Sequence, residues 1–233
     1  MNRSSLIGIA ILLLAPAVGY TAGATPAGPS PSETSRGLKA ALTQAVQVAV
    51  DNLGRKDGFL GNPEVRIPLP GKLEKAQGML KILGLNSQTD ALVTAMNRAA
   101  EAAVPEARVL LVDAVKQMSI QDAAAILTGA PDAATQYFRR KTSGKLTERL
   151  QPLVGKATQQ VQLAKRYDDV AGKASQLGLI DAKDANLDGY VTRKALDGLF
   201  LMMAREEQAI RKDPLGQASS LLRQVFSTGG AAP

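Results

Sequence analysis

The stretch "LKAALTQAVQVAVDNLG", residues 38–54, decides the fold class. Its apolar side chains recur every three or four residues, from Leu38 through Ala45 to Leu53, and Gly54 follows them. That spacing places them on one face of a helix, and glycine is typical of the position just after a helix ends. The same period returns along most of the chain, so the sequence predicts an all-α protein.

Interruptions of this pattern predict a compact bundle of about eight or nine helices with short connections. "SIQD" at 119–122 has a serine N-cap followed by an acid at the third position, which is typical of a helix start. Pro152 is expected to end one helix and begin another, because proline disrupts a helix interior. Thr192 is expected to cap the apolar helix that follows it.

A Gly- and Pro-rich stretch, "GRKDGFLGNPEVRIPLPG" at 54–71, interrupts the first two predicted helices. Its composition excludes a helix, and Val65 and Ile67 would point the same way in an extended segment. Three interpretations are open: a lid across the bundle, a small two-stranded ribbon with "GYVT" at 189–192, or a purely structural closure.

The N-terminus predicts export. Residues 1–24 contain Arg3, a short apolar run and an Ala-Gly-Ala site, which is the layout of a cleaved signal peptide. Residues 25–36 are rich in Pro, Gly and Ser and predict a disordered linker, residues 37–226 a single helical domain, and residues 227–233 a loose tail. No later run is apolar for long enough to cross a bilayer, so we expect a periplasmic protein that is not integral to the membrane.

The composition excludes several classes of site. The chain has no His, no Cys and no Trp. The Ser-His-Asp and Cys-His catalytic arrangements and zinc sites built from Cys and His are therefore excluded. Carboxylates, Lys, Ser and oxygen-ligated metals remain. Export and the small number of aromatic residues argue against nucleic acid as a partner.

The charge favours anionic partners. The formal net charge is +7, or about +6 once Arg3 has been removed with the signal peptide. The segment 137–167 is strongly basic, with Glu148 as its only acid, and its candidate anion-binding residues are Arg139, Arg140, Lys141 and Lys145. They can form a site for anionic lipid or another polyanion, or simply a solvated helix face.

A twelve-residue stretch, "DANLDGYVTRKA" at 184–195, resembles the calcium loop of an EF-hand. Position twelve, where an EF-hand has a bidentate Glu, is Ala195, so the site lacks two of its oxygen ligands. No cofactor other than this calcium ion is expected. The alternative interpretation is a turn followed by a helix cap. The residues in the oxygen-ligand positions are Asp184, Asn186, Asp188, Tyr190 and Thr192.

Two further groups of polar residues stand out among apolar neighbours. Asn97, Arg98 and Glu101 lie among alanines at helical spacing, where they can line a pocket or form a surface pair. Glu206 and Glu207 are adjacent, so their side chains point about 100° apart on a helix and do not form a catalytic pair by themselves.

Four motifs in the same order resemble the bacterial domain of unknown function 4197 family. They are "DGFLGNPEVRIPLP" (57–70), "AMNRAAEAAVPEA" (95–107), "DAAAILTGAPDAATQYFRRKTSGKL" (122–146) and "LDGYVTRKALDGLFLMMAREE" (187–207). The likeness covers most of 37–226. It implies an exported, mostly helical protein and carries no assigned activity. In that family the "YVT" and "KALDGLF" residues persist while the acids before them vary, which weakens the calcium hypothesis.

Three functional hypotheses follow. The first is a non-enzymatic periplasmic protein that binds a lipid or another anionic component of the envelope. The second is an interaction or structural module for another envelope protein, which a large exposed apolar patch would favour. The third is an enzyme that uses carboxylate or Lys chemistry, which a cleft holding a buried, pKa-shifted Glu or Lys would favour.

Overall fold

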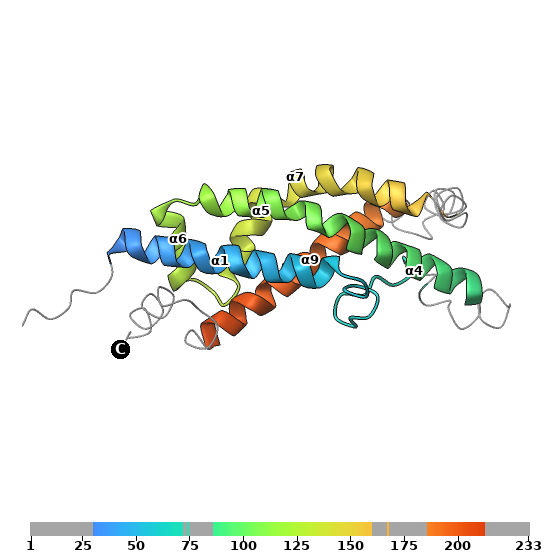
Figure 1. Cartoon of the computed structure of the whole chain (residues 1–233), viewed down its shortest axis with the longest axis horizontal. Coiled ribbons are helices and arrows are strands. Elements are labelled where there is room, and N and C mark those ends of the chain that lie inside the picture. The colour runs from blue at the N-terminus through green and yellow to red at the C-terminus, as the bar shows by residue number, and fades with distance from the viewer. Residues whose placement is uncertain (1–29, 72–73, 75–85, 160–166, 168–185, 213–233) are drawn as a thin grey trace, which may run out of the picture.

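The computed structural model describes residues 30–71, 74, 86–159, 167 and 186–212. These residues form six α-helices and one short 3₁₀ helix, η1, joined by irregular segments (Figure 1). In chain order the elements are α1 (Pro31–Gly54), α4 (Asn86–Ala103), η1 (Val104–Glu106), α5 (Ala107–Lys116), α6 (Ile120–Thr128), α7 (Ala133–Thr158) and α9 (Leu187–Lys212).

The predicted all-α class is confirmed, whereas the predicted eight or nine helices and the ribbon are wrong for the part of the chain that is described. One predicted break does not occur, because α7 continues through Pro152. Pro152 is exposed, so the outer side of the helix accommodates its ring.

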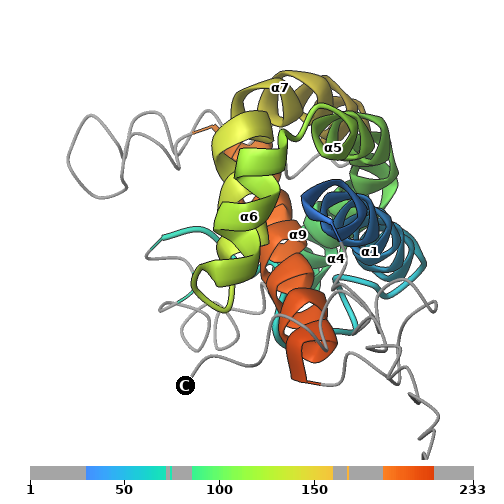
Figure 2. The ribbon, with the colours of Figure 1, turned by 90° about the vertical axis from the view of Figure 1, so that its left-hand side faces the viewer.

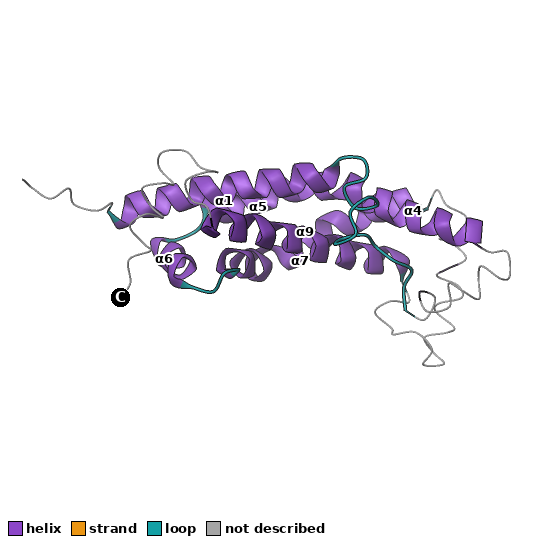
Figure 3. Ribbon diagram, turned by 90° about the horizontal axis from the view of Figure 1, so that it is seen from below, coloured by secondary structure: helices purple, strands orange, loops and turns teal. Residues whose placement is uncertain are grey.

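The described residues contain no strand (Figure 3). "GYVT", at 189–192, lies within α9 and so cannot pair as a strand. Ile67, which was expected to pair with this segment, is hydrogen-bonded to Asn97 instead. The Asn97 side chain accepts from the Ile67 N–H at 2.8 Å and donates to the Ile67 carbonyl at 2.9 Å. One side-chain amide therefore supplies the donor and acceptor that a neighbouring strand would have offered.

The predicted linker at 25–36 is too long at its C-terminal end. Ser30 caps α1 through a capping box: its hydroxyl accepts from the Glu33 N–H, and the Glu33 carboxylate accepts from the Ser30 N–H at 2.8 Å. Pro31, at the first helical position, has the backbone angle that a helix requires. Residues 31–36 therefore belong to α1. The predicted signal peptide and the predicted tail lie outside the described residues.

The long helices run antiparallel to their chain neighbours. In Figure 1, α1 runs from left to right, α4, η1 and α5 return as an almost continuous rod, α7 runs back above them, and α9 crosses beneath. The 3₁₀ turn at Pro105 marks the junction in the rod. The short helix α6 lies across one end of the bundle (Figure 2).

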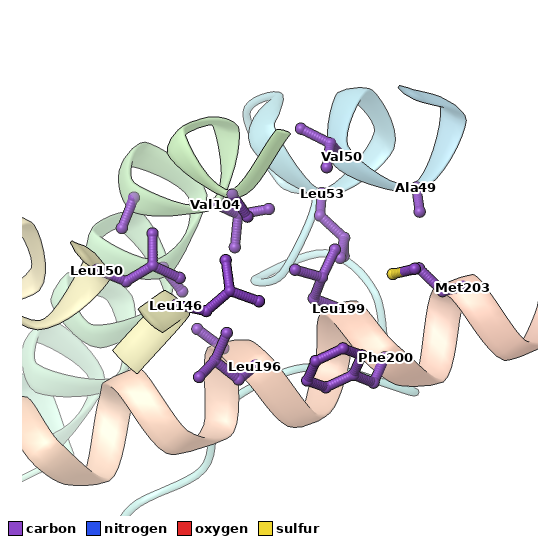
Figure 4. Packing of buried hydrophobic residues seen from close by; sticks show 14 of the residues in the cluster. Ala49, Val50, Leu53, Val104, Leu146, Leu150, Leu196, Leu199, Phe200 and Met203 are labelled. Carbon is purple, nitrogen blue, oxygen red and sulfur yellow. The ribbon is translucent and has the colours of Figure 1, made fainter. Parts of the chain in front are cut away.

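The core lies where α1, η1, α7 and α9 meet (Figure 4). Leu53, Leu146 and Leu199 are fully buried there, and each contributes about 1.5–3 kcal/mol by leaving water. The segment 55–71 adds Phe59 to this core. Phe59 packs against α9 at a glycine: a Cβ on Gly198 would lie 2.8 Å from the Phe59 ring, so only glycine permits this approach.

Candidate functional site

Helix α7 presents a basic face to solvent because its opposite face is committed to the core. Phe138, Leu146, Leu150 and Val154 are buried at a spacing of four or eight residues. The helical period turns the basic residues between and around them outward. The outward-facing basic residues are Arg139, Arg140, Lys141, Lys145, Arg149 and Lys156.

The structure separates the four predicted anion-binding residues into two kinds. Arg139 is engaged with α9: its guanidinium lies 3.4 Å from Asp197 and 4.6 Å from the centre of the Phe200 ring. Arg140, Lys141 and Lys145 are exposed, and none of them forms an ion pair with another described residue. We call these three residues the α7 basic face.

Two basic residues extend this side of α7 and were not predicted as part of the site. Arg149 follows Lys145 by four residues and donates to Glu106 of η1 at 2.6 Å, and Lys156 is exposed one turn beyond Pro152. The sequence signal was the four-residue step from Lys141 through Lys145 to Arg149. From Arg140 to Lys156 the basic side chains extend over about 24 Å of helix.

Asp122 on α6 is an acid whose pKa is affected by two residues of the α7 basic face. Hydrogen bonds from the Ser119 N–H and the Ser119 hydroxyl lower the pKa of Asp122, and Lys141 and Arg140 lower it further. Lys141 also lies 5.9 Å from the centre of the Tyr137 ring. The charges on the first turns of α7 therefore interact with the charge at the start of α6.

The polar group Asn97, Arg98 and Glu101 proves to be neither a pocket nor a surface pair. Asn97 and Glu101 are buried, and Glu101 accepts from the Phe59 and Leu60 N–H groups at 3.1 and 3.0 Å. Arg98 joins Glu101, at 2.6 Å, to Asp57, at 2.8 Å. Together with the Asn97 bonds to Ile67, these contacts hold the segment 55–71 onto α4, which favours the structural-closure interpretation of that segment.

Glu207 has a role that its sequence position did not reveal. It is buried, and it accepts from the Ala134 N–H at 3.0 Å and the Thr135 N–H at 2.9 Å. It therefore caps the N-terminus of α7, where the helix dipole favours a carboxylate. Arg211 pairs with it at 2.9 Å and also donates to the Ile126 carbonyl at 2.8 Å.

The EF-hand-like stretch is largely helical. Asp184 lies outside the described residues, and α9 begins at Leu187, the fourth position of the supposed loop. Asn186 caps the helix by accepting from the Gly189 N–H at 2.7 Å, so Thr192 is not the cap that was predicted.

The remaining candidate ligands of that stretch have other hydrogen-bond partners. Thr158 bonds Asp188, Tyr190 donates to the Pro68 carbonyl, and Thr192 donates to the Asp188 carbonyl. Because they lie on a helix, Asp188, Tyr190 and Thr192 do not converge as they would in a wrapped loop. No group of three or more acidic side chains suited to a metal ion occurs among the described residues.

One recess among the described residues is too small for a small ligand or substrate. This recess of about 10 Å³ lies between α1, α6 and the last turn of α9, and this is the space of roughly one water molecule. Its walls are apolar apart from Glu207 and Arg211, which bond each other. None of the described helices is long and apolar enough to span a membrane.

Comparison with known proteins gives one match. A family model described as "Protein of unknown function (DUF4197)" matches residues 28–227, which is most of the chain. No curated protein and no solved structure matches.

Proposed function

The chain belongs to the DUF4197 family, and from that premise we propose that it is a non-enzymatic protein that binds an anionic component of the cell envelope. The observation that supports this proposal is the α7 basic face. Arg140, Lys141 and Lys145 are exposed on a rigid helix and form no ion pair within the described residues. The envelope location rests on the predicted signal peptide at residues 1–24.

The chemistry of the α7 basic face fits phosphate-bearing surfaces or polymers better than a single small anion. Arg140 and Lys141 are adjacent and point about 100° apart, and Lys145 lies one turn beyond Lys141, so the three cations spread over the outer surface of α7 and do not converge on one point. Each cation near an anionic membrane contributes about 1 kcal/mol, so three cations give useful affinity only when they act together.

An enzyme is less well supported by the described residues. The two buried carboxylates, Glu101 and Glu207, already accept backbone N–H groups and pair with an arginine. The recess that Glu207 lines, at about 10 Å³, is too small to hold a substrate. A carboxylate held in this way stabilises the fold and has no free oxygen for acid–base chemistry.

Binding to anionic vesicles tests the proposal. We expect the full mature chain to co-sediment with vesicles that contain anionic phospholipid and to dissociate as salt is raised. The triple variant Arg140→Gln, Lys141→Gln, Lys145→Gln should bind about a hundredfold more weakly, because three contributions of about 1 kcal/mol are lost.

A matched control removes the same charge elsewhere. Arg55, Lys56 and Arg66 are exposed on the segment 55–71, and replacing all three with Gln changes the net charge equally. This control variant should bind nearly as well as the wild type. An equal loss in both variants would mean that binding follows net charge and not the α7 basic face. A soluble polyphosphate competitor distinguishes a membrane surface from a free polyanion.

A further inference from the structure

Helix α6 exposes a surface with almost no charge. From Ser119 to Pro131 the chain contains a single charged residue, Asp122. Ile120 is 49 % exposed, Ala124 and Ala125 are exposed, and Leu127 is partly buried. Exposed helix faces usually carry charged residues, whereas the outer face of this short helix, at one end of the bundle, has Asp122 as its only charge.

The one charged residue on α6, Asp122, is hydrogen-bonded to Ser119, the N-cap of the same helix. The Asp122 carboxylate accepts from the Ser119 N–H at 3.0 Å and from the Ser119 hydroxyl at 2.8 Å. In return, the Ser119 hydroxyl accepts from the Asp122 N–H at 3.0 Å. These bonds hold one carboxylate oxygen of Asp122 against the first turn of α6, so the carboxylate serves as part of the helix cap.

The uncharged surface has cations beside it. Helix α6 packs against α7, and Arg140 and Lys141 act electrostatically on Asp122, which is two residues from Ile120. Their helix is held in place there, because the Tyr137 hydroxyl donates to the Ala114 carbonyl at the end of α5. An apolar edge and a cationic edge therefore meet at the same end of the bundle, where α6 lies across it (Figure 2).

We propose that the α6 end of the bundle lies on an anionic lipid bilayer, with Ile120 in the headgroup region and Arg140 and Lys141 against lipid phosphates. This inference rests on the proposed function and names its ligand and its orientation. Peripheral membrane binding commonly combines an apolar contribution with a cationic one, since either alone is weak. The charge complementarity of Arg140 and Lys141 favours a lipid surface over an uncharged protein groove as the occupant.

A tryptophan reporter tests the orientation directly. The chain has no Trp, so Ile120→Trp gives a single emission signal from the exposed end of α6 in the full mature chain. On adding anionic phospholipid vesicles we expect a blue shift of this emission and quenching by lipids brominated on their acyl chains. The matched reporter is Val109→Trp on α5, where the native side chain is 65 % exposed, and its emission should not shift.

A second pair of variants measures the apolar contribution. Ile120→Gln should weaken binding to anionic vesicles about tenfold and leave binding to soluble polyphosphate unchanged. Val109→Gln should change neither. Both sites are exposed, so thermal melting should confirm that each variant folds as the wild type does.

The outcomes separate this inference from the proposed function. Vesicle binding with an unshifted signal from Ile120→Trp, or an undiminished affinity of Ile120→Gln, overturns the α6 orientation and leaves binding through α7. Binding to polyphosphate without binding to vesicles overturns the bilayer as ligand. Failure to bind either one overturns both proposals.

Discussion

Glu101 and Glu207 both attach a distant backbone segment to the helix that carries them, at different places in the bundle. Each is a buried carboxylate that accepts two consecutive backbone N–H groups from a distant segment and pairs with an arginine on its own helix. Glu101 holds the irregular segment 55–71, whereas Glu207 holds the first turn of α7. The two side chains make the same kinds of bond, but one binds an irregular segment and the other binds a helix N-terminus.

From this difference we can predict how much of the structure should be destabilised when each carboxylate is removed. The segment 55–71 is also held by Asn97 and by the burial of Phe59, and it can detach while the helices stay packed. The first turn of α7 lies between α6 and α9, and Arg211 ties Glu207 to the last turn of α6 as well. We therefore expect a local effect at Glu101 and a global one at Glu207.

The largest effect is expected for Glu207→Ala. It removes the cap of α7 and leaves the partly buried Arg211 without its carboxylate beside unsatisfied N–H groups, which should cost about 4 kcal/mol of unfolding free energy. Urea denaturation followed by circular dichroism measures this. A loss below about 1 kcal/mol would show that α7 does not depend on its distant cap.

The neighbouring residue supplies the control. Burial raises the pKa of Glu206, so folding disfavours its ionised form and the charge costs stability at neutral pH. Glu206→Gln should therefore be neutral or slightly stabilising. A large loss in this variant would mean that the last turns of α9 tolerate no substitution, and the comparison with Glu207 would lose its meaning.

A smaller and more local effect is expected for Glu101→Ala, at about 2 kcal/mol. The Phe59 and Leu60 amides lose their acceptor, so their hydrogen exchange should accelerate far more than that of amides in α9. Asn97→Ala should do the same at Ile67. Uniform acceleration across all helices would show that the segment 55–71 is part of the global folding unit and contradict the comparison.

The smallest effect concerns Asp122, an exposed carboxylate that caps its own helix. Hydrogen bonds from Ser119 lower its pKa below the ordinary value of 3.8, so its stabilisation is present above that value and is lost as pH falls through the folded pKa. Asp122→Asn should cost about 0.5 kcal/mol at neutral pH, and the difference from wild type should shrink towards pH 2. A difference that stays constant with pH would argue against the carboxylate as its source.

Local sequence patterns predicted the parts of the fold that depend on near neighbours. The apolar period of α1 and the capping box of Ser119 and Asp122 involve residues at most four apart, and both appear as expected. The predicted helix break at Pro152 is wrong. Proline removes one backbone hydrogen bond, but the helix continues because Leu150 and Val154 on either side of it are packed in the core.

Distant partners could not be predicted in this way. Asp132 occupies the N-cap position of α7, but its carboxylate accepts from the Gln136 side chain and makes no cap bond. The cap comes from Glu207, 73 residues beyond Ala134. Asn97 and Glu101 were visible as polar residues among alanines, but their partners were unpaired backbone groups, which the sequence does not mark. The basic residues of α7 were identified because the excess of basic residues in the segment 137–167 is visible in the sequence.

The distant cap of α7 has a consequence for the order in which the chain folds. Helices α1 and α6 carry capping boxes that span three residues, so their first turns can form as soon as those residues meet. The first turn of α7 must wait until α9 brings Glu207 across a loop of more than 70 residues, and closing such a loop is slow. The start of α7, which leads into the cations of the α7 basic face, should therefore be among the last parts of the protein to reach its native conformation.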